Sequence, residues 1–136
     1  AAVGSTVGAN LDPSHLIWQG IDPVLAIRKL GDAIYHFHAK DTKVDPYNSA
    51  TDGVLDTKHY SDELHRAWVF RSVGYGHDLQ FWRDIVSNLR LVGYDKVMSI
   101  EHEDSLMSID EGLSKAVACL REAIMSDPKP SSMHWA

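Results

Sequence analysis

Short apolar stretches alternate with amphipathic helical stretches along this 136-residue chain, and this alternation constrains its fold more than any other feature. Strands are predicted at residues 7–11, 33–39 and 96–100, and a helical run of apolar residues follows each of them. A helix between two strands carries the chain back to the same end of a sheet, so that the strands run parallel. The sequence therefore predicts an α/β fold with a parallel sheet.

Capping residues mark where the three predicted helices begin. Asp22 and Asp78 are good N-caps, and Ser108 opens the capping box Ser-Ile-Asp-Glu. Gly31 and Gly93 follow the first two helical runs and are typical of helix C-termini. These signals predict one helix directly after each of the three capping residues.

One domain is predicted over residues 1–125, because a chain of this length fits one domain. Within it, the polar segment 40–66 is predicted to be a long inserted loop, of the kind that is usually functional or mobile. Residues 68–73 are predicted to form a short extended piece. The segment 126–136 holds two prolines and is predicted to be a tail, either disordered or docked on a partner.

The charge balance excludes some classes of partner. Thirteen Lys and Arg residues against nineteen Asp and Glu residues give a formal net charge of −6, whereas attachment to nucleic acid needs clustered positive charge. No apolar run approaches the length of a membrane span, and no signal-peptide pattern leads the chain. Cys119 is the only cysteine, so no internal disulfide can form. We predict a cytoplasmic protein that binds neither nucleic acid nor membranes.

Each predicted strand ends in a residue that can bind a metal ion. Asp12 follows the first strand, His38 lies near the tip of the second, and Glu101 follows the third. Reactive residues of such folds collect at the C-terminal ends of the strands. If the three side chains share the inward face, two carboxylates and one imidazole converge, a set that suits Mn²⁺, Co²⁺, Zn²⁺ or Mg²⁺. The residues alone leave open that the acids are solvated and the histidine is a hydrogen-bonded core residue.

Further polar residues surround these three positions in the sequence. Asn10 and His36 lie two residues before the first two of them, on the same strand faces, and are predicted to support the ligands. Lys40, just beyond the second strand, is predicted to bind a substrate phosphate or hydroxyl, or else to be solvated. Arg71 flanks a glycine turn and is predicted either to line the mouth of a substrate pocket or to lie on the surface.

Four motifs, in this order, resemble the sugar phosphate isomerase/epimerase family, whose members have the xylose-isomerase-like barrel. The motifs are NLDPSH, HFHAKD, VGYGHDLQFW and SIEHED, and the resemblance covers about residues 7–124. It implies a TIM-type (β/α)₈ barrel, which takes about 250 residues. A chain of 136 residues would then hold the C-terminal three or so βα units of such a barrel.

The resemblance also implies roles for individual residues. Asp12, His38 and Glu101 match the family's metal ligands, Glu101 matches one of its two acid/base groups, and His15 matches a histidine that binds substrate oxygens. The chemistry implied is proton transfer beside a carbonyl, through an enediolate that a divalent metal ion stabilises. The family's first glutamate lies on an earlier strand and has no match in this chain. We therefore expect the chain alone to be inactive, and the remaining N-terminal part of the barrel to complete it, either in the same polypeptide or in a partner chain.

Three alternative functions stay open at this point. Relatives with this barrel include lyases such as inosose dehydratases and hydrolases such as AP endonucleases of the endonuclease-four type. The hydrolases would need an Asp-x-His pair after the second strand, and the sequence has none there. The third alternative is a sugar-binding barrel that has lost its catalysis. In every case but the hydrolase the expected ligand is a small sugar, and a homo-oligomer is a further expectation.

Overall fold

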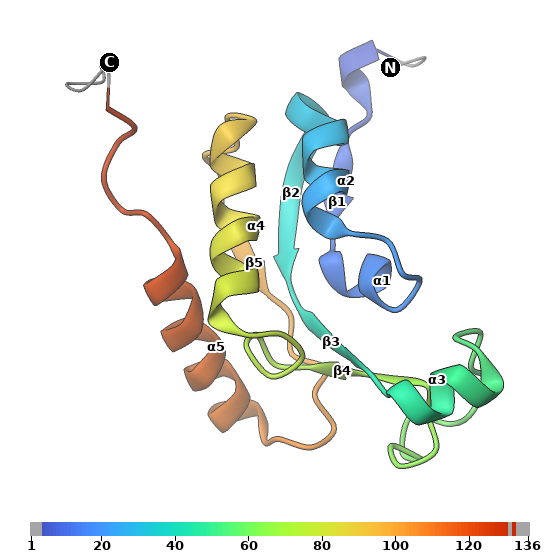
Figure 1. Ribbon diagram of the computed structural model, residues 1–136. Coiled ribbons are helices and arrows are strands. Elements are labelled where there is room, and N and C mark those ends of the chain that lie inside the picture. The colour runs from blue at the N-terminus through green and yellow to red at the C-terminus, as the bar shows by residue number, and fades with distance from the viewer. Residues whose placement is uncertain (1–3, 131, 133–136) are drawn as a thin grey trace.

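A three-stranded parallel sheet forms the centre of the computed structural model, which describes residues 4–130 and 132 (Figure 1). Strand β2 (Ile34–Ala39) lies between β1 (Ala9–Leu11) and β5 (Met98–Ile100), and both neighbours run parallel to it. The α/β fold predicted from the sequence is confirmed. Both outer strands are shorter at their N-terminal ends than predicted.

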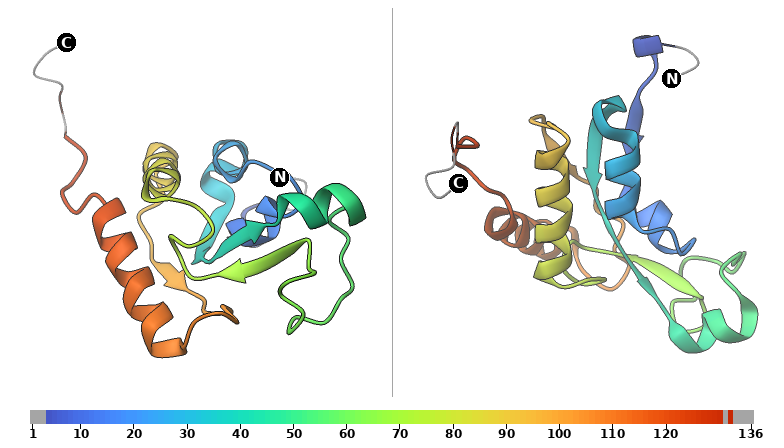
Figure 2. Two further views of the ribbon diagram at one scale, coloured as in Figure 1. Left: turned by 60° about the horizontal axis from the view of Figure 1, so that its bottom comes forward. Right: turned by 45° about the horizontal axis from the view of Figure 1, so that its top comes forward.

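Three helices pack against the sheet and against one another. Helices α2 (Pro23–Leu30) and α4 (Leu79–Leu91) lie side by side on one face, and α5 (Ile109–Ala123) packs beside α4 and β5 (Figures 1 and 2). All three begin where the sequence predicts, because each N-cap side chain accepts hydrogen bonds from the first helical turn. These N-caps are Asp22, Asp78 and Ser108.

The hydrophobic core lies between the sheet and these helices. Phe37 and Ala39 of β2 are fully buried and pack in one cluster with Trp82 of α4. Full burial of a phenylalanine side chain contributes about 1.5–3 kcal/mol to folding. His36 and His38 alternate with these apolar residues and therefore lie on the opposite face of the strand. The sheet thus keeps an apolar face for the helices and a polar face for chemistry.

The prediction of a long loop over residues 40–66 is wrong for much of its length. Strand β3 (Asp41–Val44) is separated from β2 by a single residue and pairs antiparallel with β4 (Trp68–Arg71). Sequence reasoning missed β3 because Asp41 and Thr42 are polar residues, which are typical of a loop. Both are fully buried, because hydrogen bonds satisfy their side chains. Strand β4 confirms the predicted extended piece in the first part of residues 68–73.

The structure contains two short helices that were not predicted from the sequence. Helix α1 (Pro13–Ile17) follows β1, and α3 (Pro46–Asp52) follows β3. Asp12 and Asp45 cap them, and each is followed by a proline, the same signal that begins α2. The remaining helical turns are the 3₁₀ segments η1 (Gly4–Thr6) and η2 (Gly31–Ala33).

The beginning of the predicted tail is tied to α4. The Arg90 guanidinium donates hydrogen bonds to the carbonyl oxygens of Met125 (3.3 Å) and Asp127. Residues 126–130 form neither helix nor strand, and residues 131 and 133–136 of the tail lie outside the described residues. Within the described part of the chain, no helix has the length and apolar character to cross a membrane.

Candidate metal centre

Asp12 owes its position to the junction between β1 and α1. Its Oδ1 accepts hydrogen bonds from the backbone N–H of Ser14 (2.9 Å) and from the Ser14 hydroxyl (2.6 Å). These bonds cap α1 and fix the carboxylate at the tip of the strand. The other oxygen, Oδ2, remains for a different partner and lies 3.2 Å from Lys40 Nζ. One residue therefore caps a helix with one oxygen and serves the candidate site with the other.

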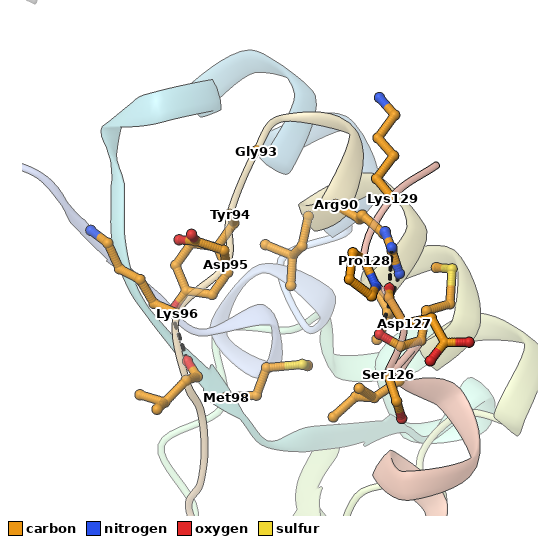
Figure 3. A pocket seen from close by; sticks show the side chains of 15 residues that line it. Arg90, Gly93, Tyr94, Asp95, Lys96, Met98, Ser126, Asp127, Pro128 and Lys129 are labelled. Atoms are coloured by element: carbon orange, nitrogen blue, oxygen red, sulfur yellow. Dashed lines mark hydrogen bonds between the residues drawn. The ribbon is translucent and has the colours of Figure 1, made fainter. Parts of the chain in front are cut away.

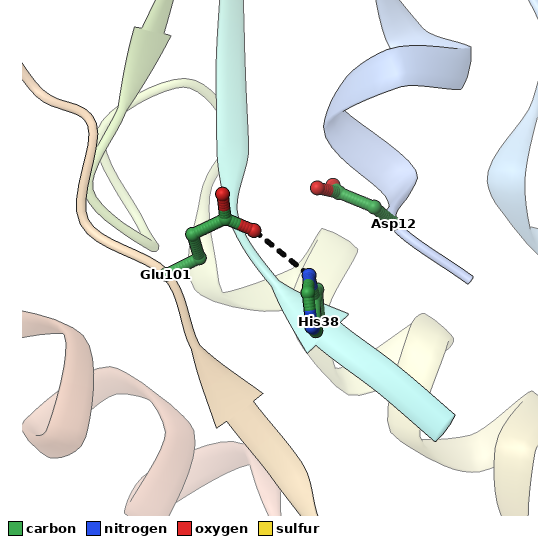
Figure 4. A group of neighbouring side chains, drawn as sticks. All are labelled: Asp12, His38 and Glu101. Carbon is green, nitrogen blue, oxygen red and sulfur yellow. Dashed lines mark ion pairs between the residues drawn. The ribbon is translucent and has the colours of Figure 1, made fainter. Parts of the chain in front are cut away.

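His38 and Glu101 meet at the tips of the next two strands (Figure 4). His38 Nδ1 lies 2.8 Å from Glu101 Oε2. The Glu101 backbone N–H donates to the Ala39 carbonyl (3.3 Å) and so extends the pairing of β5 with β2 up to the carboxylate. Asp12, His38 and Glu101 each offer one ligand atom, and these atoms lie within 4.8 Å of one another. The structure thus brings together the three residues predicted from the strand tips.

The donor set fits a divalent cation of intermediate or hard character. Two carboxylates and one imidazole suit Zn²⁺, Mn²⁺ or Co²⁺, and the carboxylates also suit Mg²⁺. All three side chains are partly buried, so water screens their charges less than at an open surface. Three protein ligands leave coordination positions for a substrate or a further ligand, as in catalytic rather than structural sites. Asp12, His38 and Glu101 are therefore the residues that would hold such an ion.

Lys40 places a buried positive charge beside these ligands. Its side chain is 2% exposed, and its Nζ lies 3.2 Å from Asp12 Oδ2, 3.1 Å from Glu101 Oε1 and 2.8 Å from Glu103 Oε2. Burial alone lowers the pKa of Lys40, but hydrogen bonds and charge from the three carboxylates outweigh it and raise the pKa above its ordinary value. The alternative that Lys40 is a solvated residue is therefore wrong.

The positive charge of Lys40 also acts on Glu101. Burial raises the pKa of Glu101, but the Lys40 ammonium and the His38 imidazole outweigh it, so the pKa lies below its ordinary value. Glu101 is therefore ionised at neutral pH. An ionised carboxylate can act both as a metal ligand and as a proton acceptor.

The two predicted supporting residues both touch histidines of the polar face. Asn10 Nδ2 lies 3.3 Å from His38 Nε2, on the side of the ring opposite Glu101. His36 Nε2 lies 2.8 Å from the Ser99 hydroxyl oxygen, and the His36 ring meets the His38 ring edge-on at 5.4 Å. Contacts with Asn10 and with His36 restrict the orientation of the His38 ring. Asn10 and His36 thus stand where supporting residues are expected.

His15 and Arg71 differ in how they meet the candidate centre. The His15 side chain is exposed, with Nε2 3.6 Å from Asp12 Oδ2, and its ring lies edge-on to Phe70. Arg71 points elsewhere, because its Nε donates to the Asp104 carboxylate at 3.1 Å. The structure therefore brings His15, but not Arg71, to the predicted ligands. Substrate binding by either residue stays a prediction.

Two acidic residues near the site make contacts that the sequence did not predict. Glu103, whose place in the sequence suits either a pocket residue or a solvated loop acid, lies within hydrogen-bond distance of Lys40. Asp41, whose place after the strand suits contact with a phosphate or hydroxyl or else solvation, is fully buried and accepts hydrogen bonds from six N–H groups. The sequence signal that could have indicated this role of Asp41 is the glycine turn at residues 74–76, because backbone N–H groups that a turn leaves unpaired need an acceptor. The donors are Thr42 N, Gly74 N, Gly76 N, His77 N, His77 Nδ1 and Trp82 Nε1.

A second region of the described structure holds a hollow whose lining includes none of the three candidate ligands (Figure 3). Its volume is about 760 Å³, and its lining includes Tyr94, Met98, Ile124 and Pro128. These residues flank the N-terminal end of β5 and the ends of α4 and α5. Because reactive residues of parallel α/β folds collect at the C-terminal strand ends, this hollow is not the candidate active site.

Sequence comparison assigns the chain to a family. The model of the xylose isomerase-like TIM barrel family matches residues 1–123, and the chain belongs to that family. The resemblance predicted from the four motifs is thereby confirmed. The three βα units described above are consequently part of a TIM-type barrel.

Two similar proteins show how much of such a barrel this chain spans. "Uncharacterized protein YfiH" of Bacillus subtilis (strain 168) is 46% identical over 123 residues, which cover 90% of this chain and 39% of the relative. The crystal structure of a xylose isomerase domain protein from Planctomyces limnophilus matches with a TM-score of 0.57 and 24% identity. That match covers 85% of this chain and 35% of the solved chain, and at this identity it shows the fold alone.

Proposed function

We propose that this chain supplies the metal-binding end of a sugar isomerase or epimerase that depends on a divalent cation. The observation that carries the proposal is the convergence of Asp12, His38 and Glu101 at three adjacent strand tips. A bound divalent ion would polarise a substrate carbonyl and neutralise the charge that develops on its oxygen. Membership in the barrel family supports this class of activity, because the family includes sugar isomerases and epimerases.

In this proposal Glu101 moves the proton. Its carboxylate is ionised and takes a proton from the carbon beside the substrate carbonyl. Lys40 Nζ lies 3.1 Å from Glu101 Oε1 and keeps a fixed positive charge beside the carboxylate and near the reacting atoms. Asn10 and His36 hold the His38 ring at its angle, so that the ligand geometry persists through the reaction.

The same proposal requires the rest of the barrel. Both β1 and β5 are edges of the sheet among the described strands, and each pairs only with β2. We propose that further parallel strands pair with these edges and contribute the second acid/base group, which epimerisation needs on the opposite face of the substrate. The chain spans less than two fifths of the relatives described above, which leaves room for these units.

The first experiment measures metal binding by the full polypeptide that contains this chain. Purified protein, stripped with a chelator and titrated with Mn²⁺, is compared with His38→Ala and Glu101→Gln. We expect each variant to weaken binding by more than about tenfold. His59→Ala is the matched control, because His59 lies in an exposed loop and its side chain forms hydrogen bonds only with Ser61 among the described residues. Unchanged binding in both ligand variants would contradict the proposed centre.

The second experiment tests the reaction. A panel of ketoses and aldoses is incubated with the metal-loaded protein in D₂O, and deuterium at the carbon beside the carbonyl is followed by NMR. Exchange with an altered sugar product supports isomerase or epimerase activity, and loss of water from the sugar indicates the lyase alternative instead. Absence of exchange with every sugar, in a protein that binds Mn²⁺ through His38, would leave the metal centre standing and refute the reaction.

A further inference from the structure

The candidate centre already contains one positive charge. Lys40 Nζ lies 3.2 Å from Asp12 Oδ2 and 3.1 Å from Glu101 Oε1, so the ammonium group contacts two of the three candidate ligands. Two like charges that share the same ligands repel each other strongly where little water screens them. A divalent ion held by Asp12 and Glu101 would therefore be destabilised by Lys40 unless another group balances the ammonium charge.

The ammonium group of Lys40 is enclosed by protein. Lysine side chains usually keep their charged end in water, but this side chain is only 2% exposed. Its Nζ lies 4.5 Å from the centre of the Phe70 ring, and Phe70 is itself buried. The flanking residues Ala39 and Asp41 are also fully buried, so the backbone holds Lys40 in place. The charge of Lys40 is therefore balanced by protein groups and not by bulk water.

Glu103 is the one carboxylate around Lys40, among the described residues, that does not belong to the candidate ligand set. Its Oε2 makes the shortest of the three carboxylate contacts with Lys40 Nζ, at 2.8 Å. The Glu103 side chain is 48% exposed and lines a hollow of about 290 Å³, so water can reach the rest of the carboxylate. Glu103 can thus keep its contact with Lys40 while Asp12 and Glu101 bind an ion.

The backbone on both sides of Glu103 is anchored to the sheets. The Glu101 N–H donates a hydrogen bond to the Ala39 carbonyl at the end of β2 (3.3 Å). The Asp104 carboxylate is 5% exposed and accepts a hydrogen bond from the Ser72 N–H just after β4 (2.8 Å). These bonds place the Glu103 carboxylate over the centre before any ion binds, so its position costs little further ordering.

From these contacts we infer that Glu103 is a positioning residue for the metal centre, which holds and balances the Lys40 ammonium group so that Asp12 and Glu101 can bind a divalent ion. The inference rests on the proposed function, since it concerns how tightly the same centre holds its ion. Glu103 acts through Lys40 and is not itself a ligand. Loss of its negative charge should therefore weaken ion binding only while Lys40 carries its positive charge.

A double-mutant cycle on Mn²⁺ binding tests this dependence. The full polypeptide that contains this chain is stripped with a chelator and titrated calorimetrically with Mn²⁺, as wild type, Glu103→Gln, Lys40→Met and the double variant. We expect Glu103→Gln to weaken binding about tenfold in the wild-type background, and by at least about threefold less in the Lys40→Met background. Circular dichroism checks that each variant is folded, and Lys40→Gln is a second uncharged background.

The dependence on Lys40 distinguishes this role from the alternatives. A similar loss in both backgrounds overturns the inference, because Glu103 would then act on the ion directly or on the fold in general. Unchanged binding in Glu103→Gln overturns it as well. Glu111→Gln is the matched control, because Glu111 forms the same kind of pair with Lys115 (2.7 Å) on the exposed surface of α5. This control should leave Mn²⁺ binding unchanged.

The same titrations separate this inference from the proposed function. If His38→Ala weakens Mn²⁺ binding and Glu103→Gln does not, the metal centre stands and the role of Glu103 is refuted. If neither His38→Ala nor Glu101→Gln weakens Mn²⁺ binding, the proposed centre is refuted, and the role of Glu103 with it.

Discussion

Substitution of Asp41 by asparagine tests how the site region is held together. Asp41 is fully buried at the start of β3, and its two oxygens accept hydrogen bonds from six N–H groups. Four of these bonds end on Oδ2 and two on Oδ1. Most of the donors belong to the turn that links β4 to α4, so this carboxylate fastens that turn to the start of β3, next to Lys40.

The cost of the substitution follows from the geometry of the amide group. The less costly orientation places the asparagine NH₂ where Oδ1 stood, facing Thr42 N and His77 Nδ1. A neutral His77 ring can accept a hydrogen bond from this NH₂, but the Thr42 N–H loses its acceptor, which costs about 1–3 kcal/mol. The four bonds on the remaining oxygen lose their charge assistance, while the desolvation cost of the carboxylate disappears. We expect Asp41→Asn to lower the free energy of unfolding by about 2–4 kcal/mol.

Urea unfolding of the full protein, followed by tryptophan fluorescence, measures this loss. Hydrogen exchange measured by mass spectrometry locates it, because amides of the turn at residues 73–78 should exchange faster in the variant. Asp78→Asn is the matched control, since asparagine caps a helix about as well as aspartate. A loss in Asp41→Asn no larger than that of Asp78→Asn, with unchanged exchange in the turn, would refute the reasoning.

Three further predictions concern the same region. Lys40→Met should tighten Mn²⁺ binding in a calorimetric titration, because its ammonium no longer occupies two of the candidate ligands, whereas the exposed Lys43→Met should not. Asp104→Asn tests a pH dependence: burial raises the pKa of Asp104, but hydrogen bonds from backbone N–H groups and a guanidinium outweigh it and lower the pKa. A carboxylate with a depressed pKa stabilises the fold above its ordinary pKa near 4, and this stabilisation is lost as the pH falls through the pKa of the folded state. In urea unfolding, the wild type should therefore lose its extra stability over the variant between about pH 4 and pH 2. A difference in stability that does not change with pH would contradict this. Gly76→Ala should cost about 1–3 kcal/mol in urea unfolding, since its methyl group would lie 2.4 Å from Asp41 Oδ1 and from a backbone oxygen; wild-type stability would show that the turn can move.

Much of the fold could be predicted because local signals agree with the final packing. Asp22, Asp78 and Ser108 begin helices as their capping chemistry indicates, and those helices bury the apolar faces that their periodicity indicates. The three ligand positions could be predicted for a related reason. A strand tip fixes where a side chain lies, so Asp12 and Glu101 needed only the strand boundaries to be placed.

The hairpin could not be predicted because its stability comes from distant parts of the chain. Strand β3 consists of Asp-Thr-Lys-Val, which has weak strand character, and its pairing partner lies more than twenty residues later. Asp41 in that strand is buried only because the glycine turn after β4 supplies its donors. Helices α1 and α3 are a different case, because the Asp-Pro signal for each of them is present in the sequence.

The clustering of charge around Lys40 could not be predicted for a related reason. Its three carboxylate partners come from the ends of β1 and β5, and only the packed sheet sets their distances. The sequence places Lys40 next to a strand tip but does not show whether its long side chain turns inward. Glu103 and the hollow it lines depend on the same packing.

The junction of β2 and β3 has a consequence for how chains of this kind can change in length. Only Lys40 lies between the strand of the parallel sheet and the strand of the hairpin. An inserted or deleted residue there would turn every following side chain of β3 to the opposite face and pull Asp41 from its turn. Residues 53–65 carry no helix or strand in the described structure, so insertions there leave the register intact. Changes in length that alter what the protein binds are therefore most readily accommodated in residues 53–65, while the spacing from His38 to Asp41 stays fixed.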